Sequence, residues 1–207
     1  MSCDRTTTAL LIFAKAPVAG LAKTRLIPAL GALGAAELAQ RLLDHAVYIG
    51  IEAGFDYCEL CTTPDHSHAK FQRLAARYPL RLTAQGEGDL GERMHRALSR
   101  VLVDHACVLL VGTDVPALSA AVLREAAAAL DTGDAVFVPA LDGGYALVGL
   151  TGAHAELFTD MPWSTPQVMQ ATRARARAAQ IAWTELASVA DIDEPADLVH
   201  LPEGWLA

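Results

Sequence analysis

The chain has 207 residues, of which 53% are hydrophobic and 19% are charged. This balance excludes an intrinsically disordered chain, which needs low hydrophobicity and high charge, and it allows a sizeable apolar core. The formal net charge of −8 makes nucleic acids and anionic membrane surfaces poor partners, because both are negatively charged. We expect one globular domain over residues 1–207 that binds no nucleic acid.

The amino-terminal residues do not resemble an export signal. Asp4 interrupts the region that precedes the apolar run, and the run itself, residues 9–14, is short. No apolar run approaches the ~18 residues of a membrane-spanning helix. The chain has 4 cysteines, and without an export signal these are typical of reduced thiols. We therefore expect a cytoplasmic protein, and the sequence leaves its oligomeric state open.

Strands and helices alternate along the chain. Short apolar runs predict strands, and apolar residues three and four apart predict helices. The expected strands are 9–13, 57–62, 80–84, 106–111, 135–139, 145–150 and 181–186. The expected helices are 34–51, 67–76, 89–105, 119–130, 165–180 and a short one from residue 195. This alternation favours an α/β fold in which helices cover both faces of a mostly parallel sheet.

Three helix starts carry recognisable capping residues. Asp89 and Glu92 have the spacing of a capping box, in which each side chain accepts from the backbone N–H of the other residue. Ser119 is expected to cap the alanine-rich helix. Thr165 followed by Pro166 predicts an N-cap with proline at the first helical position.

The loop after the first strand is cationic in an acidic protein. Residues 5–36 contain no acidic side chain, so Lys15, Lys23 and Arg25 have no neutralising neighbour in the sequence. Open α/β sheets bind ligands at the carboxyl ends of their strands, and Gly20 lets backbone N–H groups approach an anion. A polyphosphate suits such a loop. The alternative is a flexible surface loop whose cations pair with carboxylates distant in the sequence.

Asp114 follows a strongly apolar strand and precedes Pro116, which ends that strand. Proteins that act on phosphates usually hold Mg²⁺ with one or two carboxylates together with phosphate oxygens of the substrate. Asp114 suits this role. The alternative is an ordinary turn in which the aspartate only closes the strand.

A second candidate for the metal lies in residues 191–198, where several carboxylates precede a helix that Pro195 begins. We choose Asp193 as the metal ligand and place Glu194 at the helix cap. The alternative, of similar weight, is that one of these carboxylates only caps the helix.

Two further segments are candidates for acceptor binding. The hairpin residues Asp142, Gly143, Gly144 and Tyr145 join two strands, and paired glycines allow close backbone approach. Trp163 precedes a helix N-terminus and suits stacking on a substrate. The alternatives are a tight hairpin chosen for its turn geometry and a tryptophan packed in the core.

Five ordered motifs resemble one protein family. The motifs are Leu11-Ile12-Phe13-Ala14-Lys15-Ala16-Pro17 with Lys23-Thr24-Arg25-Leu26, then Gln85-Gly86 with Gly88-Asp89-Leu90-Gly91-Glu92-Arg93-Met94, Gly112-Thr113-Asp114-Val115-Pro116, Asp142-Gly143-Gly144-Tyr145, and Pro162-Trp163-Ser164-Thr165. They resemble the bacterial glycosyltransferase-like proteins known as radical-SAM/selenodomain-associated transferase 1. The resemblance covers nearly the whole chain. It implies membership of the nucleotide-diphospho-sugar transferase superfamily.

The resemblance implies a GT-A-like, Rossmann-like fold. This is a three-layer α/β/α sandwich whose mixed, mostly parallel sheet has one reversed strand. It also implies metal binding by Asp114 and nucleotide binding by the first loop. We expect the loop from Gln85 to Met94 to contact the base or the sugar. The expected nucleotide-binding residues are Ala14, Lys15, Ala16, Pro17, Gly20, Lys23, Thr24, Arg25, Gln85, Gly86, Asp89 and Arg93.

More distant similarities bear on the reaction. The first loop and the Asp114 motif also resemble 2-phospho-L-lactate guanylyltransferases. Residues 191–198 are similar to a late Asp-Thr-Pro-Glu-Asp-Leu motif of sugar nucleotidyltransferases, which favours Asp193 as a metal ligand, although Glu194 here replaces threonine.

We expect a transferase that uses Mg²⁺ or Mn²⁺, with Lys23, Arg25 and Asp114 at the reacting phosphates. Its partners would be an NDP-sugar or an NTP and a small-molecule acceptor, so that either glycosyl or nucleotidyl transfer follows. A nucleotide-binding module without turnover is the alternative from another class.

Overall fold

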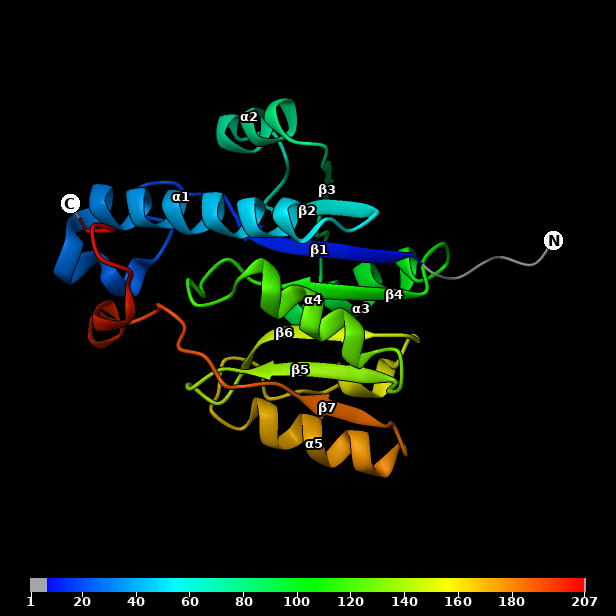
Figure 1. The fold of residues 1–207 in the computed structure, drawn as a ribbon. Coiled ribbons are helices and arrows are strands. Elements are labelled where there is room, and N and C mark those ends of the chain that lie inside the picture. The colour runs from blue at the N-terminus through cyan, green and yellow to red at the C-terminus, as the bar shows by residue number, and fades with distance from the viewer. Residues whose placement is uncertain (1–6, 207) are drawn as a thin grey trace.

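The computed structural model describes residues 7–206 and contains one seven-stranded sheet (Figure 1). The strands are β1 (Thr8–Lys15), β2 (Tyr57–Thr63), β3 (Arg81–Ala84), β4 (Cys107–Val111), β5 (Ala135–Pro139), β6 (Tyr145–Leu150) and β7 (Trp183–Glu185). Their spatial order is β3-β2-β1-β4-β6-β5-β7. All neighbouring strands pair in parallel except for β6, which is antiparallel to both β4 and β5. The predicted mixed sheet with one reversed strand is confirmed.

Helices cover both faces of the sheet. They are α1 (Ile27–Ala53), α2 (Ala69–Arg77), α3 (Leu90–Val101), α4 (Ala120–Ala129) and α5 (Val168–Ala178), with the 3-10 helices η1 (Thr24–Leu26), η2 (Ala155–Leu157) and η3 (Pro195–His200). Apolar residues of α1, α2 and α4 form one core cluster with the sheet, and those of α3 and α5 form another on the opposite face. The predicted three-layer sandwich is therefore confirmed.

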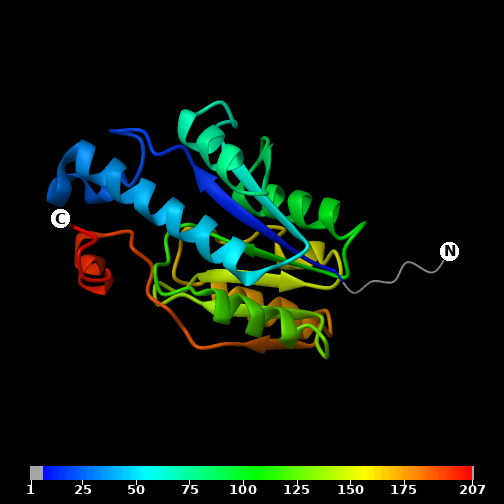
Figure 2. The same cartoon turned by 45° about the horizontal axis from the view of Figure 1, so that its top comes forward.

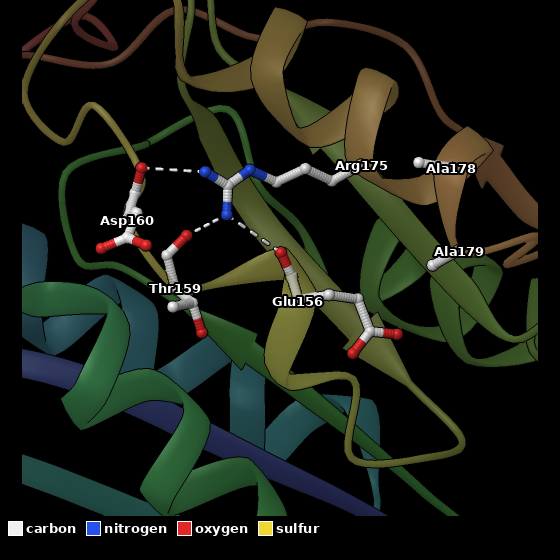
Figure 3. A pocket seen from close by; sticks show the side chains of 6 residues that line it. All are labelled: Glu156, Thr159, Asp160, Arg175, Ala178 and Ala179. Carbon is white, nitrogen blue, oxygen red and sulfur yellow. Dashed lines mark hydrogen bonds between the residues drawn. The ribbon is translucent and has the colours of Figure 1, made fainter.

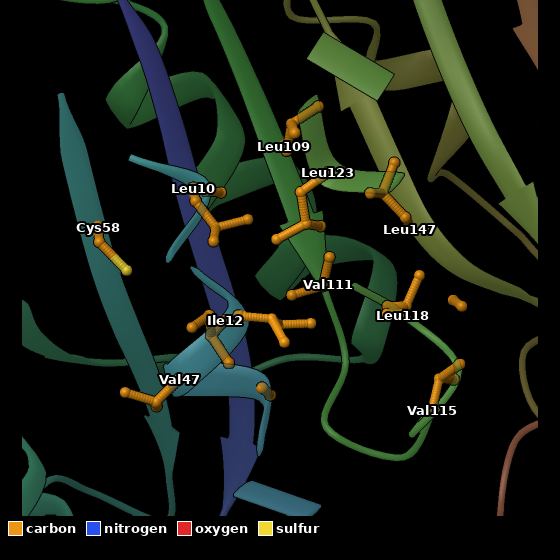
Figure 4. Packing of buried hydrophobic residues seen from close by; sticks show 14 of the residues in the cluster. Leu10, Ile12, Val47, Cys58, Leu109, Val111, Val115, Leu118, Leu123 and Leu147 are labelled. Atoms are coloured by element: carbon orange, nitrogen blue, oxygen red, sulfur yellow. The ribbon is translucent and has the colours of Figure 1, made fainter. Parts of the chain in front are cut away.

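Alternating strand residues supply the two cores. Leu10 and Ile12 of β1 pack with Val47 of α1 and Leu123 of α4, as Figure 4 shows. The residues between them, such as Leu11, belong to the cluster on the other face. This alternation follows from the two-residue period of a strand, and both sets are apolar because the strand is covered on both sides.

A third cluster joins η1 and α1 to the carboxyl-terminal segment. Leu26, Leu38 and Leu42 of η1 and α1 pack with Ile192 and with Trp205, which lie in the carboxyl-terminal segment. Figures 1 and 2 show this segment, in red, beside the amino-terminal half of α1, in blue. The packing brings residues 190–200 back to the edge of the sheet where β1 ends.

Most expected elements are confirmed, but two helix starts differ. Helix α1 begins at Ile27 instead of residue 34, with Pro28 in its first turn, and Gly31 interrupts it with φ 71°. The predicted cap at Thr165 is wrong, because α5 begins at Val168 after Gln167. Thr165 lies in the turns before the helix, where its hydroxyl donates to the carbonyl of Pro162 at 2.7 Å and accepts from the N–H of Gln167 at 3.3 Å.

The other predicted caps are confirmed. Asp89 and Glu92 form the capping box of α3, and the Ser119 hydroxyl accepts from the N–H of Val122 at the start of α4. Glu194 is the N-cap of η3, as predicted. These local hydrogen bonds depend only on residues three apart, which explains why the sequence pattern was sufficient.

The helical stretch Thr24–Ala53 is long and apolar enough, by length and composition, to cross a membrane. The sequence contains no unbroken apolar run of that length, because Arg41 and Asp44 interrupt this stretch. Core helices pass the same test, and α1 buries Leu43 and Val47 against the sheet.

A buried carboxylate was not anticipated from the sequence. Glu59 lies in β2 with 0% of its surface exposed, and the Arg100 guanidinium contacts both of its oxygens at 2.5 and 3.1 Å. The hydroxyl groups of Tyr57 and Thr83 and the thiol of Cys61 also donate to it. Burial alone would raise the pKa of Glu59, but these donors outweigh burial and lower it. The network joins β2 and β3 to α3.

Replacing Arg100 by Met should destabilise the fold by about 3 kcal/mol, the lower end for breaking a buried ion pair, because Arg100 is itself half exposed. Without its counter-ion, burial raises the pKa of Glu59 above its unfolded value, so the folded state retains a proton that the unfolded chain releases. The loss of stability should therefore be larger at pH 7 than at pH 4. Urea denaturation at both pH values measures it.

The double variant Arg100→Met/Glu59→Gln should recover part of this loss and should abolish its pH dependence, because no carboxylate remains. Arg124→Met is the matched control, since Arg124 donates only to the backbone carbonyl of Glu52 among the described residues. A loss of stability in Arg100→Met that is equal at both pH values would contradict the assignment of Glu59 as an ionised, paired group.

Candidate functional site

The side chain of Lys23 joins the two predicted metal ligands. Its Nζ lies 2.7 Å from Oδ1 of Asp114 and 2.8 Å from Oδ1 of Asp193. The same nitrogen donates to the carbonyl of Ile192 at 2.6 Å. Only 7% of the Lys23 side chain is exposed, whereas Asp114 and Asp193 are 46% and 42% exposed. A buried cation therefore lies beneath two carboxylates that face solvent.

Three segments build this arrangement at the carboxyl ends of the strands. Lys23 follows β1, Asp114 follows β4, and Asp193 follows β7. The backbone N–H of Ile192 donates to the carbonyl of Asp114 at 2.9 Å, which fastens the last segment to the loop after β4. Ile192 itself is fully buried in the third cluster with Leu26. Residues 170 positions apart in the sequence are thus held in contact.

The electrostatics of Lys23 favour its charged form. Burial by itself lowers the pKa of its ammonium, but the charges and hydrogen bonds of Asp114 and Asp193 outweigh burial, so the pKa is raised. The sequence left open a loop whose cations pair with distant carboxylates, and Lys23 does pair in this way. Its partners are the two residues proposed as metal ligands, so the ion pairs of Lys23 lie at the predicted metal site.

The donor set fits a hard divalent ion such as Mg²⁺ or Mn²⁺. Asp114 and Asp193 offer carboxylate oxygens that converge on a single point, now contacted by the Lys23 ammonium. Within residues 7–206, no group of three or more His, Cys, Asp or Glu side chains is placed to hold a metal. Two carboxylates with solvent access suit an ion whose other ligands are water and substrate phosphate oxygens.

The other cations of the first loop are exposed. Arg25 is 61% exposed, and its Nη1 lies 3.7 Å from Oδ2 of Asp193. Lys15 is exposed at the end of β1, and no ion pair or hydrogen bond of its side chain is found within the part of the chain that the structure describes. Both side chains therefore lie in solvent on the strand-end side of the sheet, with Lys15 beside the end of β2.

The segment after β3 contacts the ends of β1 and β2 through the Gln85 side chain. The Gln85 side chain is buried, and its Nε2 donates to the carbonyls of Cys61 at 3.0 Å and of Ala14 at 3.4 Å. Asp89 caps α3, and Arg93 donates to the carbonyl of Gly88 at 2.8 Å. These three predicted nucleotide-binding side chains thus have structural partners, and they hold the loop 85–89 beside the end of β1.

The hairpin between β5 and β6 lies at the same edge. Oδ1 of Asp142 accepts from the N–H of Gly144 at 2.7 Å, which is the tight turn left open as an alternative. Gly143 has φ 93°, and a Cβ atom there would lie 2.2 Å from the carbonyl oxygen of Pro166. Only glycine fits this contact, because the neighbouring atom belongs to the backbone. The hairpin is therefore packed tightly against the segment that precedes α5.

Trp163 is partly buried and packs in the core cluster of α3 and α5. Its ring is edge-on to that of Tyr145, with centroids 6.3 Å apart. Its Nε1 would lie 2.8 Å from a Cβ atom at Gly91, so the indole rests on the first turn of α3. Among the described residues this buried Nε1 has no hydrogen-bond partner. The core packing that the sequence left open for Trp163 is observed.

Asp191 was not singled out from the sequence. Burial raises its pKa to about 6, and the charges of Asp142, Asp193 and Asp197 add to that shift. Oδ2 of Asp197 accepts from the N–H groups of Asp193 and Glu194 at 3.0 and 2.7 Å. The aspartates of the last loop therefore repel one another, and Asp197 orients the backbone of Asp193. The acidic run in residues 191–197 was the available signal.

A surface hollow of about 610 Å³ lies elsewhere, at the carboxyl-terminal end of α5 (Figure 3). Arg175 fills one side of it, and its guanidinium donates to the backbone carbonyls of Glu156, Thr159 and Asp160. The hollow lies toward the amino-terminal ends of β5 and β7, because α5 leads into β7 and Trp183 pairs with Ala135. Lys23 and its carboxylates lie at the opposite ends of the strands. The arginine serves to anchor the segment that follows β6.

The family comparison covers the middle of the chain. Residues 51–165 match the family described as an uncharacterized protein conserved in bacteria (DUF2064). Among curated protein sequences, none matches this chain.

Solved structures resemble the chain over nearly its whole length. A protein of Desulfovibrio desulfuricans G20, assigned provisionally to the nucleotide-diphospho-sugar transferases, is 29% identical with a TM-score of 0.84, over 92% of this chain and 84% of that chain. A 4-diphosphocytidyl-2C-methyl-D-erythritol synthase from Anaerococcus prevotii DSM 20548 is 13% identical with a TM-score of 0.63, over 96% and 95%.

A third structure is a glucosyl-3-phosphoglycerate synthase from Mycobacterium tuberculosis in complex with Mn²⁺, UDP and its product. It is 13% identical with a TM-score of 0.53, over 94% of this chain and 75% of that chain. At such low identity the second and third likenesses show the fold alone. Together with the first, they confirm the predicted nucleotide-diphospho-sugar transferase fold, and the first, at 29% identity, supports the assignment to the transferases.

Replacing Asp191 by Asn should change how stability depends on pH in metal-free buffer. The folded-state pKa of about 6 lies above the unfolded value of about 3.9, so the stability that this group contributes is present below pH 4 and is lost as pH rises through 6. The amide does not ionise. The melting temperature of the variant should therefore rise relative to the wild type between pH 4 and pH 7.

The matched control is Asp104→Asn, which changes an exposed acid near the opposite edge of the sheet. Its melting temperature should follow that of the wild type at every pH. A difference between Asp191→Asn and the wild type that does not vary with pH would show that Asp191 is not the titrating group.

Proposed function

This chain belongs to the family described as uncharacterized proteins conserved in bacteria (DUF2064), and we propose its reaction from the geometry of the site. The protein is a divalent-metal-dependent glycosyltransferase that takes its sugar from an NDP-sugar and passes it to a small-molecule acceptor. The observation that carries this proposal is the convergence of Asp114 and Asp193 on Lys23 at the carboxyl ends of the strands.

The ends of β1 and β4 are the place where an open α/β sheet binds its ligands, because the strand order reverses between them. The proposed diphosphate lies over the first loop, where Lys23 and Arg25 supply positive charge and Gly20, with φ 80°, exposes backbone N–H groups. Lys15 faces the same ligand from the end of β1. The remaining predicted residues of this loop, Ala14, Ala16, Pro17 and Thr24, shape its backbone.

Asp114 and Asp193 would hold Mg²⁺ or Mn²⁺, which when bound neutralises the diphosphate and so makes it a better leaving group. In the proposed reaction the acceptor hydroxyl oxygen bonds to the anomeric carbon while the bond from that carbon to the diphosphate oxygen breaks. The nucleoside diphosphate leaves, and the acceptor proton passes to water. Lys23 and Arg25 stabilise the negative charge that grows on the leaving oxygen.

Other predicted residues are given supporting roles. Gly86 and the loop held by Gln85, Asp89 and Arg93 face the base or the ribose. The hairpin of Asp142 and Gly143 faces the acceptor side. Their described contacts are structural, so we propose that they act by shaping the surface. We further propose a cytoplasmic protein that binds neither nucleic acid nor membrane, in keeping with its acidic net charge.

Nucleotidyl transfer from an NTP is the second candidate, and the surplus of positive charge in the first loop favours it. Three cations face this edge, and a triphosphate carries more negative charge than a diphosphate ester. Several nucleotidyltransferases share this fold. In this case the acceptor would attack the α-phosphate and pyrophosphate would leave.

A thermal-shift screen against NTPs and NDP-sugars, each with and without Mg²⁺, distinguishes the two reactions. A ligand that binds only the folded state should add about 2.7 kcal/mol of stability at 100 times its Kd. We expect a Mg²⁺-dependent increase in melting temperature with at least one NDP-sugar. A shift with NTPs alone would favour nucleotidyl transfer, and no shift with any nucleotide would refute both proposals.

Replacing Asp114 by Asn should reduce metal-dependent turnover to below about 1% of the wild type, since the site loses a charged ligand where transition-state charge develops. Nucleotide binding without metal should change little. The thermal shift with the same nucleotide measures binding, and a product assay by mass spectrometry measures turnover.

Asp104→Asn is again the control, because it removes one negative charge at a distance. If Asp114→Asn keeps its activity, Asp114 is not an essential metal ligand. If the wild type binds the nucleotide but forms no product with any acceptor tested, a nucleotide-binding module without turnover becomes the better account.

A further inference from the structure

The ammonium of Lys23 occupies the point where a shared metal ion would lie. Both Oδ1 atoms, of Asp114 and of Asp193, contact its Nζ within 2.8 Å. A Mg²⁺ ion bound by the same two oxygens would lie about 2.1 Å from each of them. Two cations cannot share that space, because their charges repel and their contact distances overlap.

We propose that Lys23 is a built-in counter-ion that excludes the metal until nucleotide phosphates draw its ammonium away, so that metal and nucleotide bind as a coupled pair. This inference rests on the proposed function, and it adds the order and coupling of the binding steps. In the empty site Lys23 neutralises the two carboxylates. In the loaded site the metal takes its place and the ammonium contacts the phosphates.

The burial of Lys23 is the first argument for this coupling. Its side chain is 7% exposed, and its hydrogen bonds go to Asp114, Asp193 and the Ile192 carbonyl. If a metal alone displaced the ammonium, a nearly buried charge would lose its two counter-ions, which is costly. A phosphate beside the site removes this cost, because it offers the ammonium a new anionic partner.

The rigid backbone at Lys23 is the second argument, because it leaves the side chain as the part that moves the ammonium. Lys23 has φ 48°, in the left-handed region that few residues other than glycine adopt. The turns on either side fix it there, because the N–H of Leu26 donates to its carbonyl at 2.9 Å and the N–H of Ala22 donates to the carbonyl of Val18 at 2.9 Å. A lysine side chain has four rotatable bonds and can swing from a fixed backbone.

Linkage makes the proposal quantitative. If phosphates raise the affinity for metal, metal raises the affinity for phosphates by the same factor. The expected coupling is at least tenfold in the wild type, within the usual range for coupled sites. Without Lys23 the carboxylates are free, so metal should bind tightly on its own and the coupling should shrink.

The first measurement uses the unaltered protein. Mn²⁺ binding is followed by water-proton relaxation enhancement, without and with inorganic pyrophosphate, which carries the diphosphate common to NTPs and NDP-sugars. We expect Mn²⁺ to bind at least tenfold more tightly when pyrophosphate is present. Equal affinity in the two titrations would overturn the coupling while leaving a metal-binding transferase in place.

The second measurement compares Lys23→Met with Lys70→Met. Lys70 also pairs with an aspartate, at 2.6 Å from Oδ2 of Asp44, but it lies on α2 outside the site, so the control removes the same charge and the same kind of ion pair. Without pyrophosphate, Lys23→Met should bind Mn²⁺ at least tenfold more tightly than the wild type, and Lys70→Met should match the wild type. Lys23→Met should also gain less from pyrophosphate than the wild type does, because only direct contact between metal and phosphate still couples the two.

Two outcomes separate this inference from the function on which it rests. If Lys23→Met binds Mn²⁺ no more tightly than Lys70→Met, or retains the full gain from pyrophosphate, Lys23 does not exclude the metal and the inference is wrong. If neither the wild type nor any variant binds Mn²⁺ even with pyrophosphate, the proposed metal-dependent function fails, and the inference fails with it. Should Lys23→Met unfold, the wild-type titration still decides the coupling.

Discussion

The site depends on one contact, in which the Lys23 ammonium neutralises Asp114 and Asp193. Two carboxylates that meet at the end of a sheet repel each other, and a cation between them removes that repulsion. The hydrogen bond from Ile192 to the carbonyl of Asp114 and the burial of Ile192 hold the backbone in place for this contact. The carboxyl-terminal segment therefore belongs to the site as much as the first loop does.

The sheet order explains why these segments meet. β1 and β4 are neighbours in the sheet. From β1 the chain continues outward on one side to β2 and β3, and from β4 it continues outward on the other side to β5, β6 and β7. The loops that leave these strands diverge and leave space above the sheet, which is where such folds bind ligands. The reversed strand β6 adds to this arrangement, since its amino-terminal end brings the hairpin around Gly143 to the same edge.

Several residues around the site hold its loops in fixed positions. Gln85 holds the ends of β1 and β2 together, Gly143 allows the hairpin to touch the backbone of Pro166, and Trp163 packs on the first turn of α3. These residues have structural partners, yet they fix the loops that surround the site. A site of few charged groups on a rigid edge suits a reaction in which positioning and charge neutralisation do most of the work.

The amino-acid sequence alone determined the α/β class, the reversed strand through its resemblance to a family, the caps at Asp89 and Ser119, and the candidate residues at the strand ends. These depend on local patterns of apolar and polar residues, which the chain displays directly. The early start of α1 was missed, because Gly31 interrupts the helical period. The cap predicted at Thr165 was wrong, because the Thr165 hydroxyl donates to the preceding turn.

Only the tertiary structure decided that Lys23 contacts both carboxylates, that Glu59 is a buried ion-pair partner of Arg100, and that Asp191 has a raised pKa. Each of these facts depends on side chains brought together from distant segments and on their removal from water. Neither distance nor burial is written in the order of the residues, because charge energetics depend on the surroundings that folding creates.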